Sequence, residues 1–231
     1  MSNEKAEDPV NPLAGLEPQP TKGPWWKNPF IIAFFLGAAG LTVLPLLQQQ
    51  VMRAPPPVSS LGSWHLLDEH GQTISDETLK GQVWIASFFF SRCPSICPVQ
   101  QADFHKILEH VADLKSDDKK PIHLVSFSVD PAYDTPAVLK EYATRHSAPP
   151  GLWSFVTGDP AALTDLLVKR MMIDVGERMP LPGSPDLFDI GHAARFVLID
   201  QNGDVRGFWG TDELARGNLI NAARLLWKRG P

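Results

Sequence analysis

The pattern of apolar and polar residues divides the chain into an N-terminal part and a globular part. Residues 1–29 are rich in proline, carry charged residues of both signs and have few apolar side chains, which predicts a disordered tail. Residues 30–50 begin with a long apolar run without charge, about the length that a helix needs to cross a bilayer, and predict a transmembrane anchor. Residues 51–60 hold three consecutive prolines and predict an extended linker. The globular domain is expected over residues 61–231.

Within the globular part, apolar runs alternate with helical patterns. Nearly continuous apolar runs predict strands buried on both faces at residues 83–90, 123–129 and 152–157. Helical spacing or helix-start signals predict helices that begin near residues 98, 135, 159 and 211. Gln201–Asp204 lies between two apolar segments and predicts a hairpin. We therefore expect an α/β fold, with a mixed central sheet flanked by helices.

Charged residues near the apolar run predict its orientation. Lys22 and Lys27 precede the run and only Arg53 follows it, so the positive-inside rule places the tail in the cytoplasm and the domain outside. Acidic residues in the tail argue against a mitochondrial presequence, and no small-residue cleavage motif follows the run, as a signal peptide would require. The pattern predicts a single-pass protein of a bacterial inner membrane, with its domain in the periplasm.

The composition excludes two classes of protein, nucleic-acid binders and disulfide scaffolds. The formal net charge is −5 and the chain shows no basic stretch of the kind that binds nucleic acid. Two cysteines are too few for a disulfide scaffold, so the pair is one structural bridge, a redox pair or a metal site.

Both cysteines, Cys93 and Cys97, lie between a predicted buried strand and a predicted helix. Sites in open α/β sheets gather at this end of the strands. Each cysteine precedes a proline, which predicts an extended turn with the helix starting near Pro98. A helix N-terminus stabilises thiolates, and the spacing lets both sulfurs reach one metal ion or each other.

Two thiolates suit Cu(I) or zinc, and either metal would need a third ligand. The chain has seven histidines, and most of them are predicted to lie at the surface, in turns or on helices. His192 differs because it comes directly before a predicted buried strand. Imidazole is a good ligand for copper.

Four segments together resemble the Sco/SenC family of copper-binding assembly proteins. They follow the family's order over residues 61–227 and are CPSICP at 93–98, SVDPAYDTP at 128–136, LWSFVTGD at 152–159 and Gly191-His192. The departures from the family pattern are Ser95, Tyr133 and Ala193, none of which is a ligand position.

The resemblance implies a thioredoxin-like fold in which Cys93, Cys97 and His192 bind Cu(I) or Cu(II). It also implies a role as a copper metallochaperone for the dinuclear CuA centre in subunit II of cytochrome c oxidase, with another periplasmic copper chaperone as the expected donor. In this interpretation the chain is not an enzyme and has no catalytic residue.

Asp130 and Asp134 allow two interpretations. Asp130 follows a strand and Asp134 precedes a helix, which are ordinary structural positions for aspartate. The family places this loop near the metal, so the resemblance also allows a role around the ligands or in docking a partner. Met171 and Met172 are interpreted as core or surface filling.

Two other functions compete with the metallochaperone. In the first, Cys93 and Cys97 form a redox-active disulfide, and the protein is a thiol-disulfide reductase that keeps the CuA cysteines reduced. The spacing argues against this, because redox pairs usually have two intervening residues and this pair has three. In the second, the protein is a redox or copper sensor, for which the chain offers no output module.

Overall fold

The computed structural model of the chain describes residues 23–51, 54–93, 96–114, 116–181, 184–192 and 194–230. Its internal contacts divide it into two compact units, Met1–Arg53 and Ala54–Pro231. Most of the predicted tail lies outside the described residues.

The first unit contains the 3-10 turn η1 (Trp25–Lys27) and the helix α1 (Pro29–Val51). The large apolar side chains described in α1, such as Phe30, Phe34 and Leu41, are exposed. In the described part of the chain, no helix combines the length and the apolarity that crossing a membrane requires. The structure therefore confirms the helix of the predicted anchor but not its membrane-spanning role.

The second unit is built on one mixed sheet of eight strands, ordered β1-β10-β9-β4-β5-β6-β2-β3. The three central strands β4, β5 and β6 run parallel, and all other neighbours pair antiparallel. In chain order, the strands are β1 (Ser59–Ser60), β2 (His65–Asp68), β3 (Thr73–Ser75), β4 (Trp84–Phe89), β5 (His123–Ser128), β6 (Trp153–Thr157), β9 (Phe196–Ile199) and β10 (Asp204–Trp209). The predicted buried strands and the predicted hairpin are confirmed.

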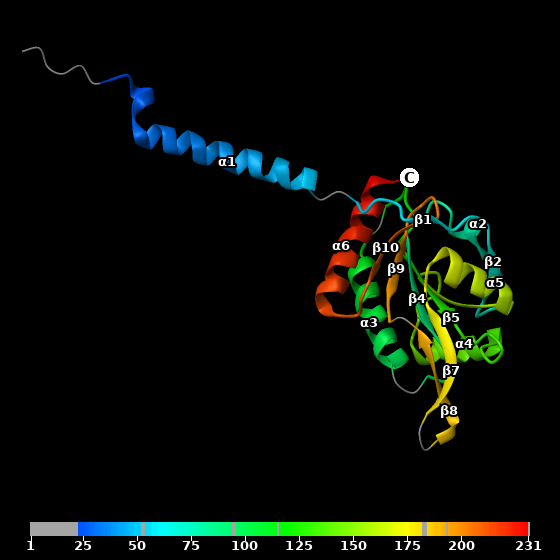
Figure 1. The fold of residues 1–231 in the computed structure, drawn as a ribbon. Helices are drawn as coiled ribbons and strands as arrows, with labels where there is room; N and C mark the ends of the chain where they lie inside the picture. Colours follow the sequence, from blue (N-terminus) through cyan, green and yellow to red (C-terminus); the bar gives the residue numbers. More distant parts are fainter. Residues whose placement is uncertain are drawn as a thin grey trace, which may run out of the picture. The chain divides into compact units, whose positions relative to one another are not determined.

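Helices cover both faces of the sheet (Figure 1). Alternate residues of β4 show the division: Ile85 and Phe89 belong to one apolar cluster, and Trp84 and Phe88 to the other. The first cluster packs under α3 (Ile96–Val111), α4 (Pro136–Arg145) and α6 (Glu213–Arg229). The second packs under α2 (Asp76–Leu79), α5 (Pro160–Thr164) and the π-helical turn η2 (Asp165–Arg170). A mixed sheet with helices on both faces fits the expected α/β, thioredoxin-like architecture.

The predicted helix starts are confirmed at two caps. The Thr135 hydroxyl accepts a hydrogen bond from the backbone N–H of Val138, and Pro136 occupies the first turn of α4. The Asp159 carboxylate accepts from the N–H of Ala162 at 2.9 Å and caps α5. Both caps satisfy N–H groups that a helix start leaves without an intrahelical acceptor.

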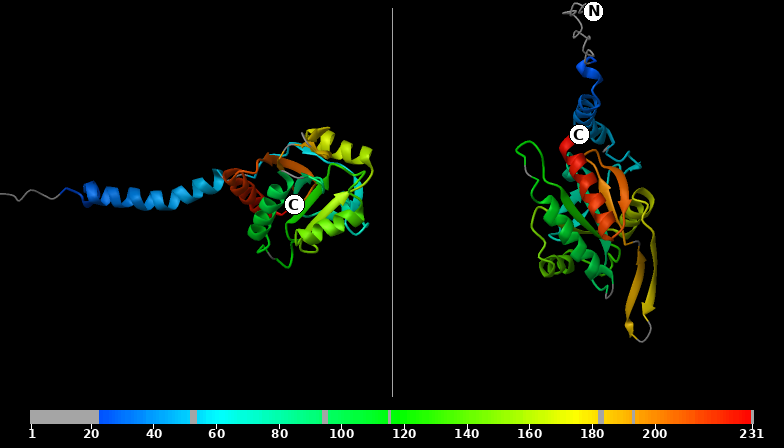
Figure 2. Two further views of the ribbon diagram at one scale, coloured as in Figure 1. Left: turned by 90° about the horizontal axis from the view of Figure 1, so that it is seen from below. Right: turned by 90° about the vertical axis from the view of Figure 1, so that its left-hand side faces the viewer.

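A second sheet of two strands was not predicted. β7 (Val175–Leu181) and β8 (Ser184–His192) pair antiparallel, with Val175 opposite His192. The hairpin extends beyond the main sheet, at the end of the domain where α3 begins (Figures 1 and 2). The last residues of the predicted linker also join the main sheet, because β1 pairs with β10 and the Val58 N–H donates to the Val205 carbonyl at 2.7 Å.

One buried histidine makes the domain sensitive to acid. The His123 ring lies between the Gly151 carbonyl, 3.2 Å from Nδ1, and the Ser154 hydroxyl, 2.9 Å from Nε2. Burial lowers the pKa of His123 from 6.5 to about 4, so the folded protein holds the ring neutral where the unfolded chain would protonate it. The stability from the neutral ring is therefore present above pH 6.5 and is lost as the pH falls toward 4.

We expect this linkage to remove about 3 kcal/mol from the free energy of unfolding across that interval. Urea unfolding at a series of pH values measures it. His123→Gln should be less stable at neutral pH and should lose less stability on acidification. His110→Gln, a change of an exposed histidine, is the matched control. Equal acid sensitivity in wild type and His123→Gln would contradict the assignment.

Candidate metal centre

The two cysteines lie at the junction between β4 and α3. A turn after β4 is closed by the Cys93 N–H, which donates to the Phe90 carbonyl at 3.1 Å. Cys97 is the second residue of α3, so the prediction that both cysteines lie on an extended turn was wrong for Cys97, while the helix does start near Pro98, at Ile96. A proline is tolerated there because the first turn of a helix needs no intrahelical N–H donors.

Both cysteine side chains are buried. The backbone N–H of Cys97 donates to the sulfur of Cys93 at 3.4 Å, so the first turn of the helix folds around that sulfur. An N–H donor and the positive end of the helix dipole both favour the thiolate form. The pair is therefore suited to bind a soft metal ion or to form a disulfide.

A buried carboxylate holds the turn before the cysteines. Asp134 is fully buried and accepts hydrogen bonds from the Ser91 N–H at 3.1 Å, from the Ser91 hydroxyl, and from the Ser128 hydroxyl at 2.5 Å. Burial raises the pKa of Asp134, although the serine donors oppose this effect. The loop after β5 is thereby joined to the residue two positions before Cys93.

The second aspartate of this loop also contacts the cysteine turn. Asp130 forms a salt bridge of 2.7 Å with Arg92, the residue directly before Cys93. The Arg92 guanidinium also lies 3.8 Å from the centre of the Tyr133 ring, which is 44% exposed. Both aspartates of the loop therefore contact residues that adjoin Cys93.

An aromatic pair lies near the cysteines. Tyr142 of α4 stacks on Phe89, the last residue of β4, with ring centres 4.9 Å apart. Burial raises the pKa of Tyr142, and the nearby charges of Cys97, Cys93 and Asp134 raise it further. The tyrosine is therefore neutral at physiological pH.

His192 ends β8, whereas the sequence placed it in a loop. Its backbone partner Val175 lines a cavity of about 210 Å³ together with Ser128 and Val129 at the carboxyl end of β5. The backbone of His192 thus reaches the edge of the sheet where the cysteines lie. Its side chain is outside what the structure describes, as are Ser95 and Ala193. Among the described residues, no group of three His, Cys, Asp or Glu side chains is placed to hold a metal ion.

Two histidines of α3 and the two neighbouring methionines have ordinary structural surroundings. His105 contacts the His146 carbonyl, and the His110 ring lies 2.7 Å from the Lys106 carbonyl of its own helix. Met171 is buried in the apolar core, as interpreted, and Met172 is 45% exposed.

Two glutamines near the cysteines were missed. Gln100 and Gln101 are fully buried in α3, three and four residues after Cys97. The Gln100 amide donates to the Arg195 carbonyl at 3.3 Å. A polar residue on the apolar face of an amphipathic helix was the signal that could have identified them.

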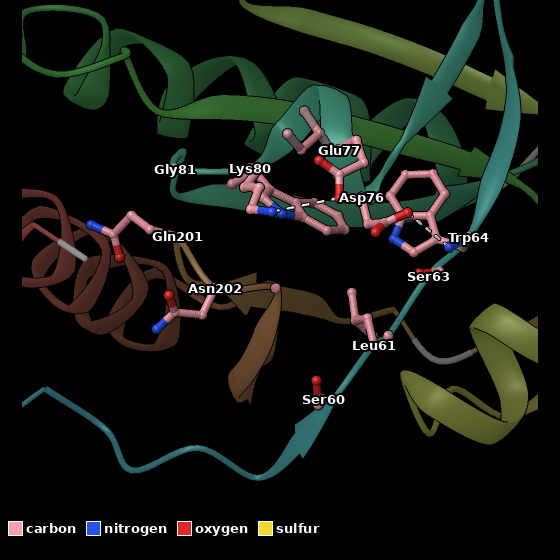
Figure 3. A pocket seen from close by; sticks show the side chains of 14 residues that line it. Ser60, Leu61, Ser63, Trp64, Asp76, Glu77, Lys80, Gly81, Gln201 and Asn202 are labelled. Atoms are coloured by element: carbon pink, nitrogen blue, oxygen red, sulfur yellow. Dashed lines mark hydrogen bonds and ion pairs between the residues drawn. The ribbon is translucent and has the colours of Figure 1, made fainter.

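A separate cavity of about 500 Å³ opens at the other end of β4, beside Trp84 and the β9–β10 turn (Figure 3). Polar groups that line it interact with one another: Asp76 accepts a hydrogen bond from the Trp64 N–H at 2.9 Å, and Lys80 lies 3.5 Å from Glu77. Neither cysteine nor histidine is among its lining residues, so it is distinct from the cysteine site.

Comparison with known proteins gives concordant matches. The SCO1/SenC family model matches residues 53–227. The SCO1 protein homolog of Bacillus subtilis is 37% identical over 142 residues, which are 60% of this chain and 67% of that protein. A SCO1/SenC family lipoprotein from Bacillus anthracis has a TM-score of 0.64 and 25% identity over 75% of this chain and 99% of the other. Yeast Sco1 with copper bound has a TM-score of 0.55 and 25% identity over 71% of this chain and 87% of the other.

Proposed function

Because the chain belongs to the SCO1/SenC family, we propose that it is a copper metallochaperone whose cargo ion is held by Cys93, Cys97 and His192. The observation that carries the proposal is the pair of buried cysteines at the start of α3, joined by the hydrogen bond from the Cys97 N–H to the Cys93 sulfur. The copper-bound yeast relative supports copper as the metal.

The donor set fits copper in either oxidation state. Two thiolates bind Cu(I) strongly, and one imidazole beside them also suits Cu(II). The thiols must lose their protons when the metal binds, and the Cys97 N–H with the helix dipole favours that loss. A three-ligand site can release its ion by exchanging one ligand at a time with an acceptor.

In this proposal, Asp130 and Asp134 act through the turn that carries Cys93. Asp134 fixes Ser91, and Asp130 fixes Arg92. Groups that orient ligands in this way commonly change metal affinity when they are lost. The exposed Tyr133 ring, stacked with Arg92, adds an aromatic surface beside the site that a docking partner can contact.

We propose the CuA centre in subunit II of cytochrome c oxidase as the recipient, and another periplasmic copper chaperone as the donor. Family membership supports this assignment. The chain would work at a bacterial inner membrane, held through residues 30–50, with the domain in the periplasm. The uncharged run in the sequence supports that location, and so does the family lipoprotein from Bacillus anthracis. Membrane fractionation of the full chain against one lacking residues 1–53 tests it.

A second function uses the same cysteines without metal. As a thiol-disulfide reductase, the pair would give two electrons and two protons to a disulfide of the CuA protein and become a Cys93–Cys97 disulfide itself. The close approach of the two cysteines favours this role. It is compatible with copper transfer, because the recipient's thiols must be reduced before they bind metal.

Anaerobic copper titration of the reduced full chain tests the primary function, followed by mixing with the metal-free CuA domain of subunit II. We expect one tightly bound copper ion per chain and its appearance in the CuA domain. Mixing the metal-free protein with an oxidised CuA domain measures reduction separately. Reduction without stable copper binding would overturn the metallochaperone and favour the reductase.

A further inference from the structure

The buried face of α3 contains two residues that an apolar core does not require. Cys97, Phe104, Ile107 and Val111 form its apolar stripe, and Gln100 and Gln101 lie within it at full burial. Buried amides weaken a fold unless hydrogen bonds satisfy them. Among the residues that the structure describes, the Oε1 atom of Gln100 and both amide atoms of Gln101 have no hydrogen-bond partner. The contacts that the structure describes therefore give no stability reason for glutamine at these positions.

The hydrogen bond described for the Gln100 amide connects α3 to the segment that follows His192. Gln100 Nε2 donates to the carbonyl of Arg195 at 3.3 Å, and Arg195 directly precedes β9. A long side chain on a helix leans back over the preceding turn. The Arg195 carbonyl is therefore held near the turn of α3 that contains Cys97.

His192 is thus fixed from two directions. On its N-terminal side, β8 pairs with β7, and Val175 lies opposite His192. On its C-terminal side, the chain is attached to α3 three residues later, through Gln100. The Gln100 side chain therefore links α3, the helix that contains Cys97, to the backbone of this segment through an uncharged hydrogen bond.

We propose that Gln100 is a positioning residue for the metal centre, which sets His192 at the correct place relative to Cys93 and Cys97. This inference rests on the proposed three-ligand function. Gln100 does not touch the metal; it acts through the Arg195 carbonyl and the chain between Arg195 and His192. Replacing Gln100 should weaken the contribution of His192 to the copper affinity. The contribution of the two thiolates should stay unchanged.

Gln100→Leu tests the inference, with Gln101→Leu as the matched control. Both substitutions replace a buried amide on the same helical turn by an apolar side chain, but among the described contacts only the first removes a hydrogen bond. We expect Gln100→Leu to bind copper about 10-fold more weakly, as changes around metal ligands commonly do. Gln101→Leu should bind copper as wild type does and melt at the same or a higher temperature.

The decisive comparison repeats Gln100→Leu in a His192→Ala background. If Gln100 acts through His192, the two substitutions are not additive, and Gln100→Leu costs less than about 2-fold in that background. An equal loss in both backgrounds would show that Gln100 does not act through His192. Unchanged affinity in the single variant would also overturn the inference.

Hydrogen exchange of the metal-free protein gives a readout that does not depend on copper. The amides around residues 192–197 should exchange faster in Gln100→Leu than in wild type or Gln101→Leu, and unchanged exchange there would overturn the inference. Failure of the proposed function gives a different result. A wild-type protein that binds no copper, or binds it equally well as His192→Ala, would refute the three-ligand model whatever Gln100 does.

Discussion

Replacing Cys97 by serine is expected to abolish stable copper binding, because a buried hydroxyl cannot replace a thiolate as a ligand for Cu(I). Cys93→Ser should have the same effect. The loss should exceed the roughly 10- to 100-fold that changes around metal ligands cause. Anaerobic titration against a competing Cu(I) chelator measures the affinity, and the copper–thiolate absorption reports the remaining sulfur ligand.

His192→Ala should have a smaller effect on Cu(I) than on Cu(II), since the two thiolates remain and Cu(II) depends more on nitrogen ligands. His110→Ala is the control, because His110 lies at the far end of α3 with its ring on the carbonyl of Lys106. Thermal unfolding of each variant without metal separates loss of a ligand from loss of the fold. Tight, unchanged copper binding by Cys97→Ser would refute the proposed centre.

The sequence predicted the elements whose signals are local. The strand β4 is an apolar run that ends before Cys93, and α4 begins with the cap and proline of Thr135-Pro136. Both are set by the residues that form them. The order of the strands and the division of α3, α4 and α6 from α2 and α5 depend on contacts between distant segments, and only the general class of the sheet could be predicted.

The hairpin β7–β8 was not predicted from the sequence, and the reason is physical. Among the described strands, β7 and β8 pair with each other and not with the main sheet, and their sequence shows no alternating apolar pattern. Its prolines, including Pro180 and Pro185, are typical of loops and rare in central strands. His192 was therefore recognised from its position before β9, while its place at the end of a strand was not.

The contacts around the cysteines could not be predicted from the sequence either. Asp130 and Asp134 were identified as ambiguous, because the same residues can cap helices or turns. Only the structure shows that their carboxylates contact Arg92 and Ser91 of the cysteine turn. The hydrogen bond from Gln100 to Arg195 joins residues 95 positions apart, and no local pattern encodes it.

Asp134→Ala is expected to give the largest loss of stability near the site. The substitution removes the acceptor for the Ser91 N–H, the Ser91 hydroxyl and the Ser128 hydroxyl. Each buried donor left without a partner costs about 1–3 kcal/mol. We expect a total loss of about 3–5 kcal/mol in the free energy of unfolding. Urea denaturation at constant pH measures it.

Asp134→Asn separates the charge of this carboxyl from its hydrogen bonds. The amide keeps one oxygen acceptor and nearly the same shape, so it should cost less than alanine. Since burial raises the pKa of Asp134, the fold favours the protonated carboxyl more than the unfolded chain does. The stability of the wild type should therefore fall as the pH rises above 3.8, the pKa of an ordinary aspartate, until the folded carboxyl is ionised.

Asp134→Asn should lack this fall, and the difference in unfolding free energy between the two proteins should narrow as the pH rises. A difference that stays constant with pH would show that the pKa of Asp134 is not raised. Copper affinity of the same variant tests the link to function. If Asp134 holds the turn before Cys93 in place, a folded Asp134→Asn protein should bind copper more weakly, and full affinity would limit Asp134 to a role in stability.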